Sequence, residues 1–518
     1  MISLILVMVC ALGAGWLANR IHVPYPIVLV LSGIGLGCLY DWPELQLEPH
    51  LMLTIVLPAV LYPAALDTSW RDFRSNLRPI LLLAIGLVAT TTLAVGAAFK
   101  GLVPQAPWAV AFALGAIVSP PDAVAATAVL RRFRLPRRIM TILEGESLVN
   151  DATGLVLYRF AVVAALTGVF SGWGLGGEFA LIALGGLMLG MAMGWITARV
   201  QERLHDPMLE LAMSLTTPFA TYCLCESLQV SGVLGVVVAG LYRSRWAHLG
   251  ISALARLNIR TFWRAVVFVV NCLVFVLIGV QLPHIAQSLL HSQTLSWGRA
   301  AGLIVILSAV TIGVRFLWIF TATYGVRWLL PSVRRRDPAS ARVSLLVSWC
   351  GMRGVVSLAA VLALPPMLPS GEPFPQRDLV ILLTFGIVFV TLVGQGLTLP
   401  VLIRALRLES DILVETESEL AREAMRRAAI LAVDELVAEH GVPAYEAVTV
   451  TRFFNGPLRP RSGGLIAPGS ETQLWLGAVA AQREALLKLW REDKIGDDVL
   501  IRLEREIDLA EARLAHDD

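Results

Sequence analysis

The sequence predicts an all-α polytopic membrane protein with about thirteen transmembrane helices and a soluble helical C-terminal tail. Two observations favour this fold class: the composition, and a regular alternation of basic and uncharged loops between apolar runs. Of the 518 residues, 56% are hydrophobic and 16% are charged, whereas a soluble globular chain carries about 25% charged residues. With a mean hydropathy of +0.71, much of the chain is expected to have lipid as its solvent.

Apolar runs recur as far as Arg404, and a helix needs about 20 residues to span a bilayer. The ninth run is short for a span, so its ends are the least well defined. The expected spans are residues 2–19, 24–40, 51–67, 78–98, 107–130, 139–168, 178–199, 208–228, 231–243, 262–282, 298–328, 342–367 and 378–403.

The loop charges support this count. Odd-numbered spans are followed by basic segments, such as residues 131–138, and the other loops are nearly free of positive charge, with Lys100 and Arg377 as the main exceptions. A missed span would make this alternation fail from that point onward. The positive-inside rule then places the N-terminus outside the plasma (inner) membrane and the C-terminus in the cytoplasm.

The composition changes after Arg404, so we expect a transmembrane domain over 1–408 and a cytoplasmic tail over 409–518. Glu, Arg and Ala recur in the tail at helical spacing, and a loop rich in Gly, Pro and Ser at 455–470 divides it into two or more helices. A packing or dimer-stabilising appendage and a regulatory sensor are both compatible with this pattern.

The charge and the cysteines exclude other classes of protein. The net charge is only +3, and the basic residues cluster in short loops, which is typical of membrane topology and not of a nucleic-acid-binding face. The six cysteines show neither metal-ligand nor disulfide spacing. We therefore expect no nucleic-acid partner and no cofactor.

Polar side chains interrupt the sixth span. Glu146, Ser147, Asn150 and Asp151 lie within its apolar sequence, and ionisable groups at bilayer depth are costly and usually functional. Ser147 and Asp151 share one helix face, while Glu146 and Asn150 share the adjacent stripe. A carboxylate beside hydroxyl and carbonyl oxygens can hold a hard monovalent cation or a proton. Asp151 is the expected carrier, with Asn150 and Ser147 shaping its site, although a carboxylate paired for structure is the alternative.

The fifth span contains Pro120 and Pro121, followed by Asp122. Two prolines remove two N–H donors and break a helix, and broken backbone at membrane depth is tolerated where it lines protein or a watery cavity. Asp122 can then compensate the positive N-terminus of the following half-helix. A kinked packing helix without an ion site is the simpler alternative.

The twelfth span contains a second break, where Gly351 and Gly354 bracket Arg353. Glycine permits irregular or closely approached backbone. A buried arginine needs a carboxylate partner, and we expect Glu146 to pair with Arg353 as a structural ion pair. Arg315, in the eleventh span, is a second buried cation of the same kind.

The two broken spans cross the membrane in opposite directions because they are seven apart. Opposed broken helices are typical of inverted-topology repeats that hold substrate near the midplane. We expect repeats formed by spans 1–6 and 8–13, with a core at residues 78–168 and 298–403.

These motifs closely resemble those of the monovalent cation/proton antiporter family, the sodium/proton exchangers. The matching segments are Gly145-Glu-Ser-Leu-Val-Asn-Asp151, Pro121-Asp-Ala-Val124 and Gly351-Met-Arg-Gly354, and the resemblance covers about residues 1–408. Weaker support comes from Asn271, Arg315 and Gln395-Gly396.

The resemblance implies a six-helix core with crossed, unwound helices beside a dimerisation domain, and a homodimer. It implies that Asp151 carries the cation (Na⁺ or K⁺) and the proton, and that Glu146 and Arg353 are the buried pair. The Asn150–Asp151 pair is similar to the electroneutral branch. Many members of the family have Thr where this chain has Pro121, which removes one side-chain ligand, so backbone carbonyls near 119–122 are expected to complete the shell with Ser147 and Asp151.

The expected function is therefore exchange of a monovalent cation, Na⁺ first and K⁺ or Li⁺ as alternatives, for H⁺ at Asp151. A monovalent cation channel gated by the tail would use the same acidic site. A sensor without transport would keep the fold and bind cations only. A carrier of anions or osmolytes would need a basic midplane site, whereas the best free group here is acidic.

Overall fold

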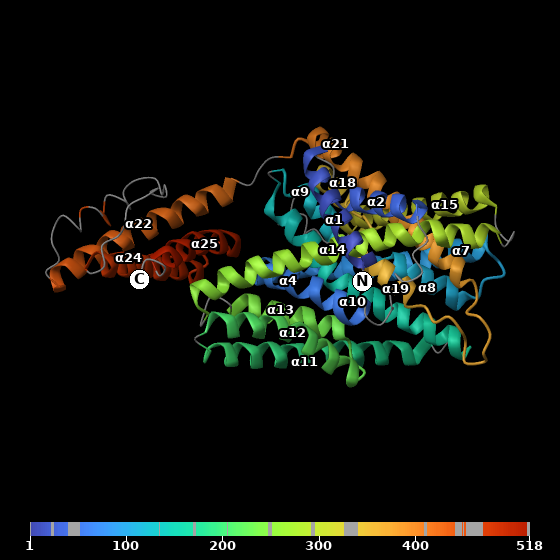
Figure 1. The fold of residues 1–518 in the computed structure, drawn as a ribbon, viewed down its shortest axis with the longest axis horizontal. Helices are drawn as coiled ribbons and strands as arrows, with labels where there is room; N and C mark the ends of the chain where they lie inside the picture. The colour runs from blue at the N-terminus through green and yellow to red at the C-terminus, as the bar shows by residue number, and fades with distance from the viewer. Residues whose placement is uncertain are drawn as a thin grey trace.

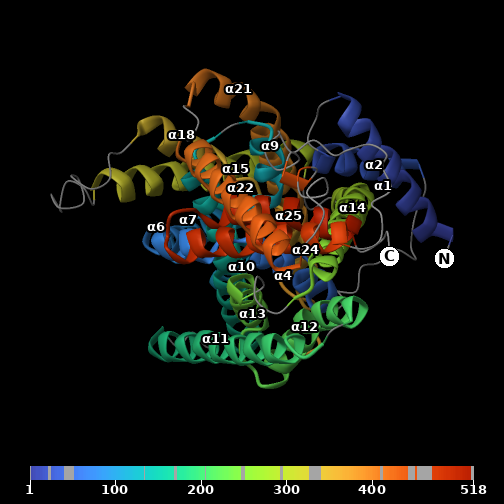
Figure 2. The same ribbon diagram turned by 90° about the vertical axis from the view of Figure 1, so that its left-hand side faces the viewer.

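The computed structural model describes most of the chain, and it does so as helices. Figures 1 and 2 show a bundle of long helices with the C-terminal helices at one end. The described residues are 2–21, 25–39, 52–133, 135–168, 172–204, 206–246, 251–291, 296–325, 340–408, 412–440, 448, 450–451 and 470–514.

The first half of the membrane region follows the expected apolar runs closely, because each run is apolar over most of a bilayer's thickness. Pro107 ends the turn before α8, and Pro136 directly precedes α10. The helices are α1 (Ile2–Ile21), α2 (Tyr25–Leu39), η2 (Met52–Val56) with α4 (Leu57–Asp67), α5 (Trp70–Ser75), α6 (Leu77–Leu81) with η3 (Leu82–Leu87) and α7 (Val88–Leu102), α8 (Trp108–Val118), α9 (Ala123–Leu130) and α10 (Arg137–Thr167).

The second half continues in the same way. The short ninth range becomes α13, and the twelfth range is divided between two short helices. The helices are α11 (Gly172–Gln201), α12 (Pro207–Ser227), α13 (Gly232–Trp246), α14 (Ala253–His291), α15 (Trp297–Phe320) with η4 (Thr321–Gly325), α18 (Ala341–Trp349), α19 (Val355–Leu362), and α20 (Arg377–Val390) with η5 (Thr391–Gln395) and α21 (Gly396–Leu406).

Each of the thirteen expected ranges contains at least one helix among its described residues. Within the described residues, seven helices are long and apolar enough to cross a membrane, and three shorter apolar helices precede them. The chain is therefore a multi-pass, all-helical membrane protein, as predicted.

The helix α10 lies in the middle of the bundle, in contact with the broken helices (Figures 1 and 2). In both views α10 lies between α11–α13 at one edge and α21 at the other. One large hydrophobic cluster joins α8, α9, α10, α15, α18, α19 and α20, and it continues into α2 and α14. The helices α2 and α14 approach closely at Gly33 and Gly279, where an added Cβ would overlap the opposite backbone. Close backbone contact of this kind is a common way to hold membrane helices together.

The tail contains three described helices, α22 (Ile412–His440), α24 (Ser470–Arg491) and α25 (Asp497–Leu514). They pack through their own apolar side chains, including Met425, Leu486 and Leu503. The expected loop at 455–470 lies outside the described residues up to 469, and Ser470 begins α24.

Candidate functional site

Two helix breaks face each other at the centre of the bundle. The first lies between α8 and α9, over residues 119–122, and the second lies between α18 and α19, over residues 350–354. The Asp122 backbone N–H donates to the Met352 carbonyl over 2.7 Å, and Arg353 Nε donates to the Val118 carbonyl over 2.7 Å. Each break thus supplies hydrogen bonds that the other has lost, which is what unwound backbone requires inside a membrane.

Asp122 caps two half-helices at once. Its carboxylate accepts a hydrogen bond from the Val124 N–H at the start of α9, over 2.8 Å, and another from the Val355 N–H at the start of α19. A negative charge beside two positive helix ends is stabilising. Asp122 therefore has a structural role at the two breaks, in addition to its place beside a cavity.

Gly354 lies at a position where no side chain fits. An added Cβ there would overlap the carboxylate of Asp122, whereas an added Cβ at Gly313 in α15 would meet nothing within 4 Å. We expect Gly354→Ala to push Asp122 away from the α19 N-terminus and to lower the exchange rate at least about tenfold, since displacing one charge-assisted hydrogen bond is equivalent to more than 1.4 kcal/mol. Gly313→Ala is the matched control, and equal rates for the two variants in proteoliposomes would contradict this account.

Asn150 and Ser147 brace the first break from α10. Asn150 Nδ2 donates to the Pro121 carbonyl over 3.0 Å, and Ser147 Oγ accepts from the Ala123 N–H over 3.3 Å. The Pro121 carbonyl, expected as a direct cation ligand, is thus engaged by Asn150. Ser147 and Pro120 line the cavity together with Asp122.

Asp151 is a buried acidic group of the site without a partner among the described residues. Its residue is 5% exposed, and its carboxylate has no hydrogen bond or ion pair to the described part of the chain. It lines a cavity of about 410 Å³ that also reaches Ser147, Asp122 and Gly354. A buried carboxylate that faces open space without a protein partner can take up a cation or a proton from that space.

Glu146 pairs with Arg315, so the expected Glu146–Arg353 pair is wrong. Arg315 donates to both carboxylate oxygens of Glu146, over 2.5 and 2.9 Å, and both side chains are 1% exposed. The bidentate geometry satisfies Glu146 fully. Spacing along the chain did not decide between the two arginines, because both lie on distant segments and only packing brings one of them into line with the carboxylate.

Arg353 instead holds the two breaks together. Besides Val118, its guanidinium donates to the Gly351 carbonyl, and its backbone N–H donates to Thr391 Oγ1 over 3.3 Å. A planar guanidinium can satisfy several carbonyls at once. Arg353 is therefore a backbone brace at the crossing point.

Comparison with known proteins identifies the family of this chain. A family model described as the transmembrane part of sodium/hydrogen exchangers matches residues 5–405. The chain belongs to the sodium/hydrogen exchanger family. The exchanger is accordingly a secondary transporter, a cation/proton antiporter and not an enzyme.

Relatives and solved structures agree with that assignment. A protein of Mycobacterium bovis named as a Na⁺/H⁺ exchanger is 34% identical to the exchanger, over 96% of this chain and 93% of its own. A protein of Escherichia coli strain K12 with the same kind of name is 31% identical, over 98% of each chain. A sodium, potassium, lithium and rubidium/H⁺ antiporter of Bacillus subtilis is 32% identical over 77% of this chain and 61% of its own. The sodium/proton antiporter MjNhaP1 of Methanocaldococcus jannaschii has the same fold, with a TM-score of 0.62 and 18% identity over 78% of this chain and 97% of its own.

Three arginines that line the cavity of the exchanger were not singled out in the sequence. Arg256, Arg260 and Arg264 line it from α14, and Asn271 lies farther along the same helix. The three arginines are four residues apart, so helical spacing alone places them on one face. That spacing could have predicted a basic face on this helix, although only the fold shows that the face borders the cavity of Asp151.

Proposed function

We propose that the protein exchanges a monovalent cation for a proton across the plasma membrane, with both ions competing for Asp151. The observation that carries this proposal is the buried carboxylate of Asp151 at the cavity wall, which is unpaired within the described chain. Asp122 is engaged by two helix N-termini and Glu146 by Arg315. Asp67 also lines the cavity without a hydrogen bond or ion pair in the described chain, but it is exposed, whereas Asp151 is buried and has neither kind of partner among the described residues. Asp151 is therefore the buried group left to bind and release ions.

Na⁺ is the cation we favour, with K⁺ and Li⁺ as alternatives. The nearby groups are oxygens: the Asp151 carboxylate, the Ser147 hydroxyl and the carbonyls of the first break. Such hard ligands suit alkali cations, and selectivity depends on the size and number of ligands. The names of the Bacillus relatives, which include sodium, potassium, lithium and rubidium, support a site that accepts more than one of these ions.

We further propose an electroneutral exchange of one cation for one proton. Asp151 is preceded by Asn150, which is uncharged and tied to Pro121, so the mobile site carries a single negative charge. Either one cation or one proton neutralises that charge during each crossing. Collapsing the membrane potential should therefore leave the exchange rate unchanged, and a rate that follows the potential would contradict this stoichiometry.

Alternating access would come from movement of the core, residues 78–168 and 298–403, against the rest of the transmembrane domain, residues 1–408.

In the proposed orientation the N-terminus is outside and the tail, residues 409–518, is cytoplasmic. We propose a homodimer that holds the non-core helices still. The contacts between the two breaks support a rigid core, because they join α8, α9, α18 and α19 into one unit.

Competition at one site gives the test of this proposal. With equal pH on both sides of proteoliposomes, exchange of radioactive for unlabelled Na⁺ should show an apparent KM that rises about tenfold for each pH unit below the pKa of the site, since bound protons exclude the cation by mass action. The maximal rate at saturating Na⁺ should be preserved. Repeating the series with Li⁺ and K⁺ ranks the cations, and a KM independent of pH would contradict a shared site.

A further inference from the structure

The tail helix α25 lies against the membrane helices at the end where α10 and α14 begin. It contacts α14 and α5 directly. Figure 1 shows α25 beside the start of α14, and Figure 2 shows the tail helices in front of the bundle. The contact joins segments that are more than 200 residues apart along the chain.

On the α14 side the contact consists of buried ion pairs. Arg256 donates to both carboxylate oxygens of Asp508, over 3.0 and 2.6 Å, and the side chains are 7% and 0% exposed. Glu504 lies 3.8 Å from Arg256 and 3.7 Å from Arg260. Buried bidentate pairs are specific in geometry, and removing one partner leaves an uncompensated buried charge.

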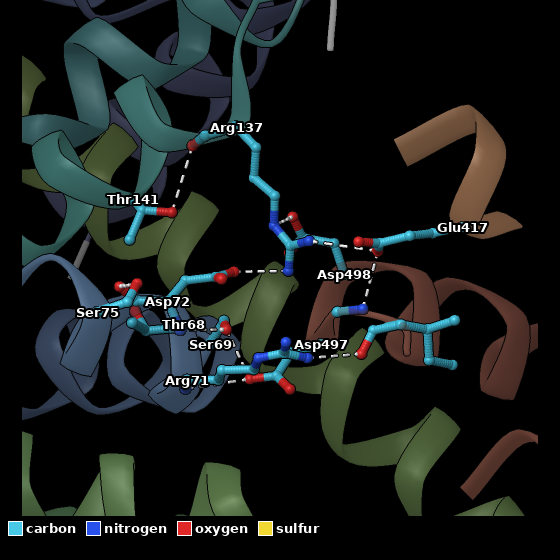
Figure 3. A network of polar contacts seen from close by, with 12 residues as sticks. Thr68, Ser69, Arg71, Asp72, Ser75, Arg137, Thr141, Glu417, Asp497 and Asp498 are labelled. Carbon is cyan, nitrogen blue, oxygen red and sulfur yellow. Dashed lines mark hydrogen bonds and ion pairs between the residues drawn. The ribbon is translucent and has the colours of Figure 1, made fainter. Parts of the chain in front are cut away.

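On the α10 side a second network holds the start of α25, as Figure 3 shows. Arg137, the first residue of α10, lies 2.8 Å from Asp498 of the tail and 2.6 Å from Asp72 of α5. Ser69 Oγ donates to Asp497 Oδ2 over 2.6 Å. Gly496 lies directly against this contact, because an added Cβ would meet the guanidinium of Arg137 and make it shift.

Between these two attachments α25 borders the ion cavity. Ile501 is one of its lining residues, and the Ile501 carbonyl accepts from Arg260 over 3.5 Å. One short helix therefore touches the cavity while bonding both to α10, which carries Asp151, and to α14. The helix α14 packs along α2 and lies outside the expected core.

We propose that α25 is an autoinhibitory clamp, which ties α10 to α14 and covers one side of the ion cavity, so that the core moves freely only when α25 is released. This inference rests on the proposed function, since it requires that α10 move against α14 during exchange. An attached clamp stabilises one arrangement of the two helices, and stabilising one state of a two-state carrier slows the cycle.

The test measures attachment and transport separately in the full-length protein. Arg256→Gln removes the buried pairs on the α14 side, and Asp498→Asn weakens the Arg137 contact on the α10 side. Hydrogen–deuterium exchange of residues 497–514 reports attachment, and Na⁺/H⁺ exchange in proteoliposomes reports transport. We expect faster deuterium uptake in both variants and an increase in maximal exchange rate of about tenfold for Arg256→Gln, since a hydrogen bond to a charged group corresponds to at least that factor.

Glu506→Gln is the matched control, because Glu506 lies on α25 but pairs with Arg422 of the tail itself. It should change neither deuterium uptake nor rate. If α25 is released and the rate is unchanged or lower, the clamp is excluded while the proposed exchange stands. If the wild-type protein shows no exchange with any of the three cations, the proposed function fails and the clamp fails with it.

Discussion

Asp151→Asn is expected to abolish cation/proton exchange while leaving the protein folded. The substitution keeps the shape of the side chain and removes the charge that would hold the cation and the proton. Asp151 forms no hydrogen bond or ion pair within the described chain, so little structure depends on its charge. The expected loss is at least about 1,000-fold, because a neutral amide cannot be titrated and provides no balancing charge for a desolvated cation. The measurement is Na⁺-driven proton movement in proteoliposomes.

The control for this variant is the same chemical change at a surface position. Asp206 caps α12 through hydrogen bonds to the Met208 and Leu209 N–H groups, a role that asparagine fulfils equally well. Asp206→Asn should transport like the wild type. Proton movement retained by Asp151→Asn, with a normal thermal unfolding curve, would place the carrier elsewhere and remove the basis of the proposed mechanism.

The second large effect is expected at Glu146 and Arg315. Either Glu146→Gln or Arg315→Met should destabilise the protein by about 3–5 kcal/mol, since each leaves a buried charge without its partner. Both side chains are 1% exposed, and Arg315 is also held by the Val347 carbonyl over 3.2 Å. Thermal unfolding in detergent should show a large fall in midpoint for each single variant.

A double-mutant cycle identifies the true partner of Glu146. The double variant Glu146→Gln/Arg315→Met should lose much less than the sum of its single variants, with a coupling of about 1 kcal/mol or more. Glu146→Gln/Arg353→Met should be closer to additive, because Arg353 donates to backbone carbonyls instead. A larger coupling with Arg353 than with Arg315 would contradict the observed pairing.

The sequence alone predicted the architecture and a candidate position for the site. Membrane helices are readable from composition because lipid demands an apolar surface over a fixed length. The breaks at Pro120-Pro121 and at Gly351 were readable because these residues act on their own backbone, whatever packs around them. Asp151 stood out for a similar reason, since a charge within an apolar run requires an explanation before any contact is known.

The tertiary structure decided which groups touch. Glu146 had two candidate arginines on distant segments, and only the fold, which brings Arg315 of α15 to the carboxylate, selected between them. The double capping by Asp122 and the seat of α25 on Arg256 likewise depend on segments far apart in sequence. Local patterns are determined by solvent and backbone chemistry, which act on each residue separately. Contacts between residues far apart in the sequence depend on how whole helices are placed and oriented. No short segment determines that placement by itself. The free carboxylate of Asp151 belongs to both levels: the sequence identified the charge, and the fold left it without a partner.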